Sequence, residues 1–294
     1  MEINAFFDAN GISPESINKY IISERTKNAD MKRTVHELQE YARTTCDELF
    51  VSETELLITN LEYCSGLMDY LSKATLDIYG QEIWDKIFGG AEMPEAGWTL
   101  EEMNAFTYET EQKFKSAVPE NGFGYTLSKG NSWVRTFGSN EHKSLTLKDV
   151  DDIVEKHNVE FINLLRNHHE SGNVFFNQII DDSVIKEYES GKWDCRRDGR
   201  VIKCTKIPFL MRRYLKETNS NMKRYYACHC PWARKSILSK KPVTKEFCHC
   251  SLSYEKRGLE EAFGRELTGR VVDTVLSDGV STCTFEIKIP DDII

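Results

Sequence analysis

Cysteine and histidine residues are concentrated near the end of this 294-residue chain, and their spacing repeats. The triplet Cys-His-Cys occurs at residues 228–230 and again at 248–250, and Cys283 follows near the C-terminus. Five of the nine cysteines fall in this region. Thiols and imidazoles bind soft metals, act as nucleophiles and transfer protons. The pattern therefore predicts a chemical site here.

One interpretation of the triplets is a zinc site, because zinc takes thiolates and imidazoles in a tetrahedral set. The spacing works against it. Two cysteines separated by one residue in a strand place their sulfurs about 7 Å apart, given a rise of ~3.3 Å per residue. The backbone must turn there before both sulfurs reach one ion. If zinc binds, the candidate ligands are Cys228, Cys230, Cys248, Cys250 and Cys283.

A second interpretation is a nucleophilic thiol, because a cysteine beside a histidine or at a helix N-terminus loses its proton more easily. Cys230 precedes Pro231, a residue typical of a first helical turn, and Cys250 precedes a helix predicted over 254–263. A third interpretation is that these are small buried residues of a core. The candidate catalytic residues are Cys230, Cys250, His229 and His249.

Charge is distributed unevenly along the chain, whose net charge is −9. Residues 1–150 carry 14 basic and 25 acidic side chains, whereas residues 151–294 carry 24 and 22. Sixteen basic side chains lie in 192–245, the segment that leads into the triplets. This segment is either a solvated face or an attractor for a small anionic molecule such as a carboxylate. The acidic chain shows no nucleic-acid-binding motif, so no nucleic acid partner is expected.

Hydropathy predicts a cytoplasmic protein with no membrane association. No apolar run approaches the ~20 residues that cross a bilayer, and the N-terminus lacks the basic-then-apolar pattern of a signal peptide. In the cytoplasm the cysteines would be mostly reduced thiols. Cys195 and Cys204, which flank a turn at Asp198-Gly199, are then expected to be a cross-strand pair of buried thiols.

The pattern of elements predicts an α+β fold with a helical N-terminal half and a C-terminal antiparallel sheet flanked by helices. Three parts are expected: a helical region (1–120), an aromatic and Gly-rich connection (121–145), and an α+β cysteine-rich ligand or catalytic domain (146–294). The connection contains a predicted hairpin or lid over 122–138.

Local signals place the strands of the last part. Asp198-Gly199 and Asp278-Gly279 predict tight hairpin turns, the second joining strands over 267–276 and 282–289. A further strand is predicted over 223–227, leading into the first triplet.

The runs Cys228-His-Cys-Pro-Trp232, Phe247-Cys-His-Cys-Ser251 and Gly279-Val-Ser-Thr-Cys283-Thr-Phe285 resemble a known family. They are similar to the C-terminal part of the L-2-amino-thiazoline-4-carboxylic acid hydrolase-like family, and more distantly to 4-vinyl-reductase-type small-molecule-binding domains. Zinc-binding versions carry Glu-x2-Cys on the first hairpin strand, where this chain has Val272-Asp-Thr-Val275 without a cysteine.

The resemblance implies hydrolysis of C–N or C–S bonds in a small anionic heterocycle. A thiolate or activated water would attack the ring carbon between nitrogen and sulfur, and a histidine would protonate the leaving sulfur. The substrate carboxylate needs an arginine. The alternatives are a non-enzymatic binding or sensor domain with a zinc- or thiol-lined pocket, and a zinc-stabilised interaction domain. The substrate-binding candidates are Arg224, Arg234, Trp232 and Tyr226.

Overall fold

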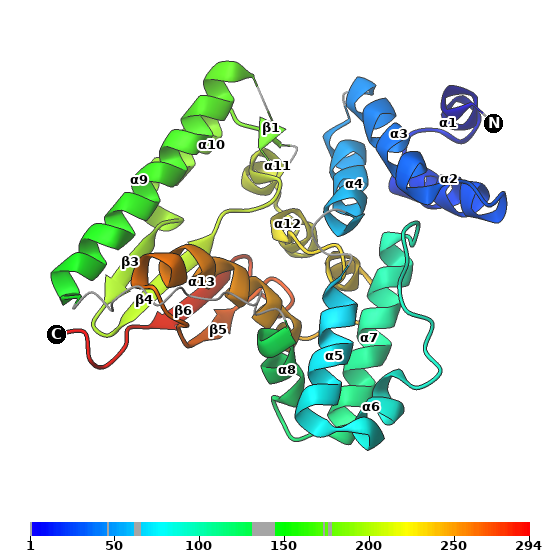
Figure 1. Ribbon diagram of the computed structural model, residues 1–294. Helices are drawn as coiled ribbons and strands as arrows, with labels where there is room; N and C mark the ends of the chain where they lie inside the picture. The colour runs from blue at the N-terminus through cyan, green and yellow to red at the C-terminus, as the bar shows by residue number, and fades with distance from the viewer. Residues whose placement is uncertain (1, 46, 62–65, 131–144, 173, 176–177) are drawn as a thin grey trace.

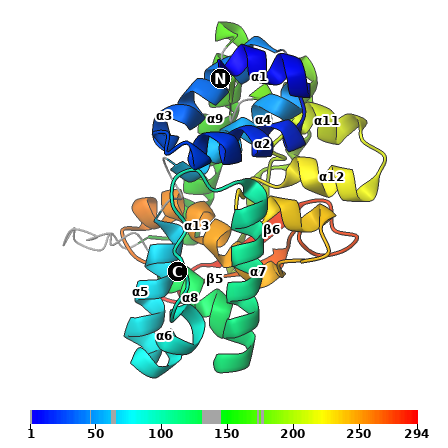
Figure 2. The ribbon, with the colours of Figure 1, turned by 90° about the vertical axis from the view of Figure 1, so that its right-hand side faces the viewer.

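The computed structural model describes residues 2–45, 47–61, 66–130, 145–172, 174–175 and 178–294. The fold is α+β, as predicted: helices dominate the N-terminal part, and a four-stranded antiparallel sheet lies in the C-terminal part (Figure 1). In the side view of Figure 2 the helices of residues 3–59 lie above the helices of residues 67–130.

The first group of helices packs through aromatic rings. The Phe7 ring lies 4.9 Å from that of Tyr41 and 5.2 Å from that of Phe50, measured between centroids. These contacts join the first, third and fourth helices into one unit. The helices are α1 (Ile3–Asn10), α2 (Pro14–Thr26), α3 (Met31–Thr44) and α4 (Glu48–Thr59).

The second group comprises α5 (Leu67–Tyr79), α6 (Gln81–Phe88), α7 (Leu100–Ala117) and α8 (Gly122–Gly130). The hairpin or lid predicted over 122–138 is wrong for its first part, which is helix α8. Phe123 and Leu127, four residues apart, are both buried, and Phe123 packs 5.0 Å from Phe114 of α7. That spacing is the helical one, and it outweighs the glycines. Residues 131–144 lie outside the described residues.

The C-terminal sheet is built from β3 (Cys195–Asp198), β4 (Val201–Lys206), β5 (Gly269–Asp273) and β6 (Cys283–Lys288), in the order β3-β4-β6-β5. All neighbouring strands are antiparallel. Helices α9 (Leu147–Ser171) and α13 (His249–Phe263) pack against it, so the sheet is flanked by helices as predicted.

The connecting elements are mostly short. Strands β1 (Val174–Phe175) and β2 (Gln178–Ile179) form a small ladder of their own. The remaining elements are α10 (Asp182–Glu187), η2 (Tyr188–Lys192), α11 (Met211–Lys216), α12 (Ser220–Ala227), η3 (Arg234–Leu238) and η4 (Lys245–Cys248).

The β3–β4 hairpin confirms the predicted turn, with Gly199 at a φ of +59° that favours glycine. Cys195 and Cys204 face each other across the two strands, as predicted. They are joined by a disulfide, so the expectation of two free thiols is wrong. Their Cα atoms lie 4.1 Å apart.

Two hydrophobic clusters stabilise the chain. The smaller one lies between the sheet and helices α9 and α13. The larger one joins side chains of α1–α8 with side chains from 180–247 and with Val275 and Leu276. Segments on both sides of 121–145 therefore share a core, and the three-part division stays a prediction.

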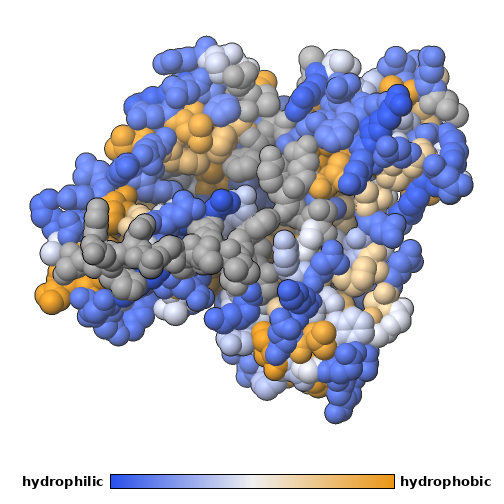
Figure 3. All heavy atoms as spheres, in the orientation of Figure 1, coloured by the Kyte–Doolittle hydropathy of each residue, from blue (hydrophilic) through white to orange (hydrophobic). Residues whose placement is uncertain are grey.

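No helix among the described residues is both long enough and apolar enough to cross a bilayer. The face shown in Figure 3 is mostly hydrophilic, with hydrophobic side chains in separate groups rather than in a continuous band.

Candidate anion site and cysteine cluster

The first triplet follows a helix. The strand predicted over 223–227 is wrong, because α12 occupies 220–227 and Cys228 is the residue that ends it. The Asn219 side chain caps α12 by accepting from the Met222 N–H at 3.0 Å. Arg224, Tyr225, Tyr226 and Ala227 are all buried, so the strand-like run of aromatics reflects a helix surrounded by protein.

The second triplet spans the junction of η4 and α13. Cys248 ends η4, and His249 and Cys250 lie in the first turn of α13. Helix α13 therefore begins about five residues before the predicted 254–263. Its end at Gly264, with a φ of +67°, brings the C-terminal turn back toward the sheet.

Three thiols gather around the chain segment that follows β5. The Cys248 side chain hydrogen-bonds the Thr274 hydroxyl, and the Val275 N–H donates to the sulfur of Cys283. Cys228 lies near enough to both for their charged forms to interact. We call Cys228, Cys248 and Cys283 the thiol cluster.

The thiol cluster is held in its protonated form. Burial raises the pKa of Cys228, raises that of Cys248 well above its usual value, and raises that of Cys283 to about 12. The proximity of the other thiols adds to the shifts of Cys248 and Cys283. A neutral thiol is a weak nucleophile and a weak metal ligand. Near pH 7 these three residues therefore present uncharged, polarisable sulfur atoms to their neighbours.

The geometry lends the zinc alternative no support. Among the described residues, no group of three or more His, Cys, Asp or Glu side chains is arranged to hold a metal ion.

The two triplet histidines are engaged with other groups. His229 Nε2 lies 2.7 Å from the Ile207 carbonyl oxygen, which can only accept, so Nε2 carries the proton. Burial, with Lys206 nearby, holds the pKa of His229 well below its usual value. His249 Nε2 lies 3.9 Å from a Glu246 oxygen, and burial lowers its pKa despite that carboxylate. Both rings are therefore neutral near pH 7.

Arg224 serves the fold. Its Nε donates to the Val275 carbonyl at 2.8 Å, and its Nη1 contacts Asp278 at 2.8 Å. The guanidinium thus ties α12 to the turn between β5 and β6. Tyr226 is buried beside it in sequence, with the Arg213 guanidinium 5.9 Å from its ring.

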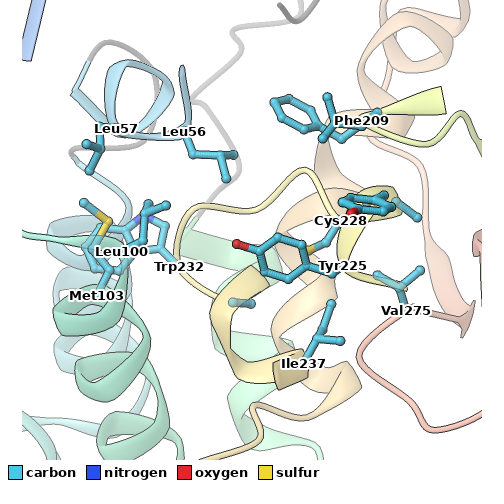
Figure 4. Packing of buried hydrophobic residues seen from close by; sticks show 14 of the residues in the cluster. Leu56, Leu57, Leu100, Met103, Phe209, Tyr225, Cys228, Trp232, Ile237 and Val275 are labelled. Carbon is cyan, nitrogen blue, oxygen red and sulfur yellow. The ribbon is translucent and has the colours of Figure 1, made fainter. Parts of the chain in front are cut away.

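Arg234 is different, because its guanidinium is buried without a hydrogen-bond partner. The residue is 0% exposed, and among the described residues no group pairs with Nε, Nη1 or Nη2. The guanidinium carbon Cζ of Arg234 lies 4.2 Å from the Tyr225 ring centroid and 5.3 Å from the Phe209 ring centroid. Figure 4 shows these two rings near Cys228, in the interior where α12, α4 and α7 meet.

Trp232 supplies a second buried donor near Arg234 in sequence. The side chain is fully buried and packs beside Leu100 and Met103 (Figure 4). Its indole Nε1 has no hydrogen-bond partner within the described part of the chain. Unpaired buried donors are rare in folded proteins, so two of them two residues apart mark this region as unusual.

The buried acid that bonds Tyr225, Glu53, is already paired with a lysine. Glu53 of α4 is 2% exposed, accepts from the Tyr225 hydroxyl and pairs with Lys235 Nζ at 2.7 Å. Lys235 also lies 3.2 Å from Glu101. Burial disfavours the Lys235 ammonium, but Glu53, Tyr225 and Glu101 together outweigh burial and leave the Lys235 pKa raised. Glu53 is therefore engaged by Tyr225 and Lys235, and Arg234 makes no hydrogen bond to it within the described part of the chain.

Sequence reasoning missed Glu53, Lys235 and Lys206. Glu53 and Tyr225 are hydrogen-bonded but lie 172 residues apart in the sequence, so no local sequence pattern predicts their contact. Lys206 lies at the end of β4, with Nζ 3.5 Å from both Glu255 and the Ser251 hydroxyl. The only signal for it was its place in the basic segment 192–245.

Comparison with known proteins adds no relative: no family model matches the chain, and no curated protein and no solved structure is significantly similar to it.

Proposed function

We propose that the protein binds a small anionic molecule, of the carboxylate class, at Arg234. The observation that carries the proposal is the Arg234 guanidinium, which is fully buried against the rings of Tyr225 and Phe209 and has no hydrogen-bond partner among the described residues. The thiol cluster and the neutral His229 belong to the same region and give it polarisable, uncharged surroundings.

The cost of burying the Arg234 guanidinium favours a bound anion as its partner. Removing a guanidinium from water costs several kcal/mol after relaxation. Each ring contributes about 2 kcal/mol or more to a desolvated cation. Stacking therefore offsets part of the burial cost, but within the described part of the chain it leaves Nε, Nη1 and Nη2 of Arg234 without hydrogen-bond acceptors. A carboxylate accepting two guanidinium N–H groups supplies both the opposite charge and the hydrogen bonds.

The neutral thiols support binding more than covalent catalysis. A resting thiolate would be the sign of an activated nucleophile, whereas Cys228, Cys248 and Cys283 are all shifted the other way. The non-enzymatic binding or sensor alternative is therefore our leading proposal.

The test uses ligand recovery and direct binding. Because Arg234 is fully buried, a resident ligand should survive purification, and denaturing the protein should release a small acid detectable by mass spectrometry. Titration calorimetry then compares the affinities of the protein for 2-amino-thiazoline-4-carboxylate, acetate and phosphate. Arg234→Met should abolish binding of the best anion, whereas Arg196→Met, at an exposed guanidinium on β3, should leave it unchanged.

The proposal fails if Arg234→Met binds these anions as tightly as the parent protein. It also fails if no acid is released and none of the three binds. Arg234→Lys separates charge from geometry: it should retain weak binding, because an ammonium cannot form the paired contacts of a guanidinium.

A second candidate is cysteine-dependent hydrolysis at Cys250, and the position of Lys206 favours it. Burial lowers the Lys206 pKa, but Glu255, Cys283 and Cys250 outweigh burial and leave it raised. The lysine is therefore an ammonium close to Cys250, and a nearby cation stabilises a thiolate.

Cysteine labelling tests this candidate. With limiting iodoacetamide at pH 7.5, Cys250 should label before Cys228, Cys248 and Cys283, and Lys206→Met should slow its labelling. Turnover of 2-amino-thiazoline-4-carboxylate that is lost in Cys250→Ser and kept in Cys230→Ser would establish the activity. Binding without turnover leaves the sensor proposal standing.

A further inference from the structure

A groove of about 720 Å³ lies on the helical N-terminal part of the molecule. Its walls come from the α2–α3 corner (residues 25–31), the loop 92–98 and the exposed side of α7 (residues 102–109). The volume falls within the range of clefts that hold ligands. We call it the α2–α7 groove, and it shares no lining residue with the Arg234 region.

Two aromatic rings line the groove. Trp98 of the loop and Phe106 of α7 are both partly exposed, and their rings meet edge to face with centroids 5.6 Å apart. Aromatic faces that stay open to solvent attract cations through the ring quadrupole.

The charge of the groove is negative. Four carboxylates and one guanidinium are among the lining groups, and the Glu109 carboxylate is paired with Lys241 Nζ at 3.2 Å. That guanidinium, Arg25, is held by Glu102 at 2.6 and 2.9 Å and donates to the Gly97 carbonyl at 3.1 Å. Within the described part of the chain, neither Glu92 nor Glu95 makes a direct ion pair, and both are exposed.

The groove is preformed by local contacts. Gly97 adopts a φ of +93°, and a Cβ there would lie 2.7 Å from the Met31 side chain, so the loop packs tightly onto α3. The next turn is fixed by Thr99, which caps α7 in a reciprocal pair with Glu102. A rigid wall loses little conformational entropy when a partner binds.

We propose that the α2–α7 groove binds a basic peptide segment. A lysine or arginine side chain of that segment lies on the Trp98–Phe106 pair, and its charge faces Glu92 and Glu95. The strongly acidic character of residues 1–150, with 14 basic and 25 acidic side chains, would attract such a partner from a distance.

Fluorescence anisotropy with a labelled peptide of alternating lysine and glycine tests the proposal, with a glutamate–glycine peptide of equal length as the comparison. The full-length protein should bind the lysine peptide, more weakly as salt rises, and not the glutamate peptide. Trp98→Ala should weaken binding about three- to tenfold, and Trp98→Phe should restore most of it.

A charge-matched pair of variants separates the groove from general attraction. Glu92→Gln with Glu95→Gln should reduce affinity by about tenfold at low salt. Asp77→Asn with Glu120→Gln removes the same charge at exposed positions outside the groove and should change affinity less than twofold.

Equal losses in the two charge variants would overturn the proposal, as would a Trp98→Ala protein that binds like the parent. A protein that binds neither peptide but self-associates, with the association lost in Trp98→Ala, would assign the groove to a second copy of the chain instead. Arg234→Met should bind the lysine peptide normally, so the two proposals fail independently.

Discussion

At the scale of single residues, two arginines ten positions apart differ in the hydrogen bonding of their buried guanidinium groups. Both are buried, yet Arg224 is bonded by Val275, Asn221 and Asp278, whereas no described residue hydrogen-bonds the guanidinium of Arg234, which lies against the Tyr225 and Phe209 rings. The sequence placed both beside the first triplet but could not separate them. Their difference depends on the segment between β5 and β6, because the Val275 carbonyl that accepts from Arg224 lies 51 residues later in the sequence.

This contrast predicts opposite effects on stability. Arg224→Met should lower the free energy of unfolding by about 2–4 kcal/mol, because it leaves a buried carbonyl unpaired. Arg234→Met, measured on protein freed of small acids, should be neutral or stabilising, because an unpaired buried charge is replaced by an apolar side chain of similar length. Urea unfolding of both variants makes the comparison. An equal large loss in both would mean that Arg234 has a partner within the folded chain.

At the scale of elements, the sequence predicted structure where the decisive contact lies a few residues away, as in the β3–β4 hairpin, which Asp198-Gly199 closes. The reciprocal caps of Thr99 and Thr146, which begin α7 and α9, are contacts of the same short range. Helix α12 was misread, because tyrosines favour strands and because the four residues of its last turn are all buried, which hides the helical period there. The disulfide of Cys195 was likewise beyond a compositional argument.

Two glycines of the C-terminal part test how closely its elements pack. A Cβ at Gly269 of β5 would lie 2.7 Å from the Glu286 carbonyl oxygen, a backbone atom that cannot turn aside. Gly269→Ala should therefore cost about 1–3 kcal/mol of unfolding free energy. Gly258 lies on the exposed side of α13, where a Cβ meets nothing nearer than 3.8 Å.

Gly258→Ala is the matched control, and it should stabilise the protein by roughly 0.5–1 kcal/mol through helix propensity. Thermal and urea unfolding should report the two changes with opposite signs. A neutral Gly269→Ala would show that β5 can move away from β6 at this position.

At the scale of the whole molecule, the larger hydrophobic cluster runs from Phe6 to Leu276, and ionisable groups lie at its centre. Tyr225 bonds α12 to Glu53 of α4, and Arg224 bonds α12 to the β5–β6 turn, so α12 joins the helical part to the sheet. The α+β class followed from the order of elements along the chain. The interior where α4, α7 and α12 meet did not, because contacts between distant segments create it.

Because this interior holds protonated groups, stability should fall in alkaline solution. Burial raises the pKa of Cys283 to about 12, and those of Cys228, Cys248 and Tyr225 are also raised by burial. A raised folded-state pKa gives stability that is complete below the unfolded-state pKa, about 8.5 for a thiol, and is lost as pH rises toward the folded value. Between pH 7.5 and 10, Cys283 alone should contribute a loss of about 1–2 kcal/mol. Urea unfolding at the two pH values measures it, and Cys283→Ser should show a smaller pH dependence, because serine does not titrate in this range. An unchanged pH dependence in Cys283→Ser would mean that the Cys283 thiol titrates normally in the folded protein.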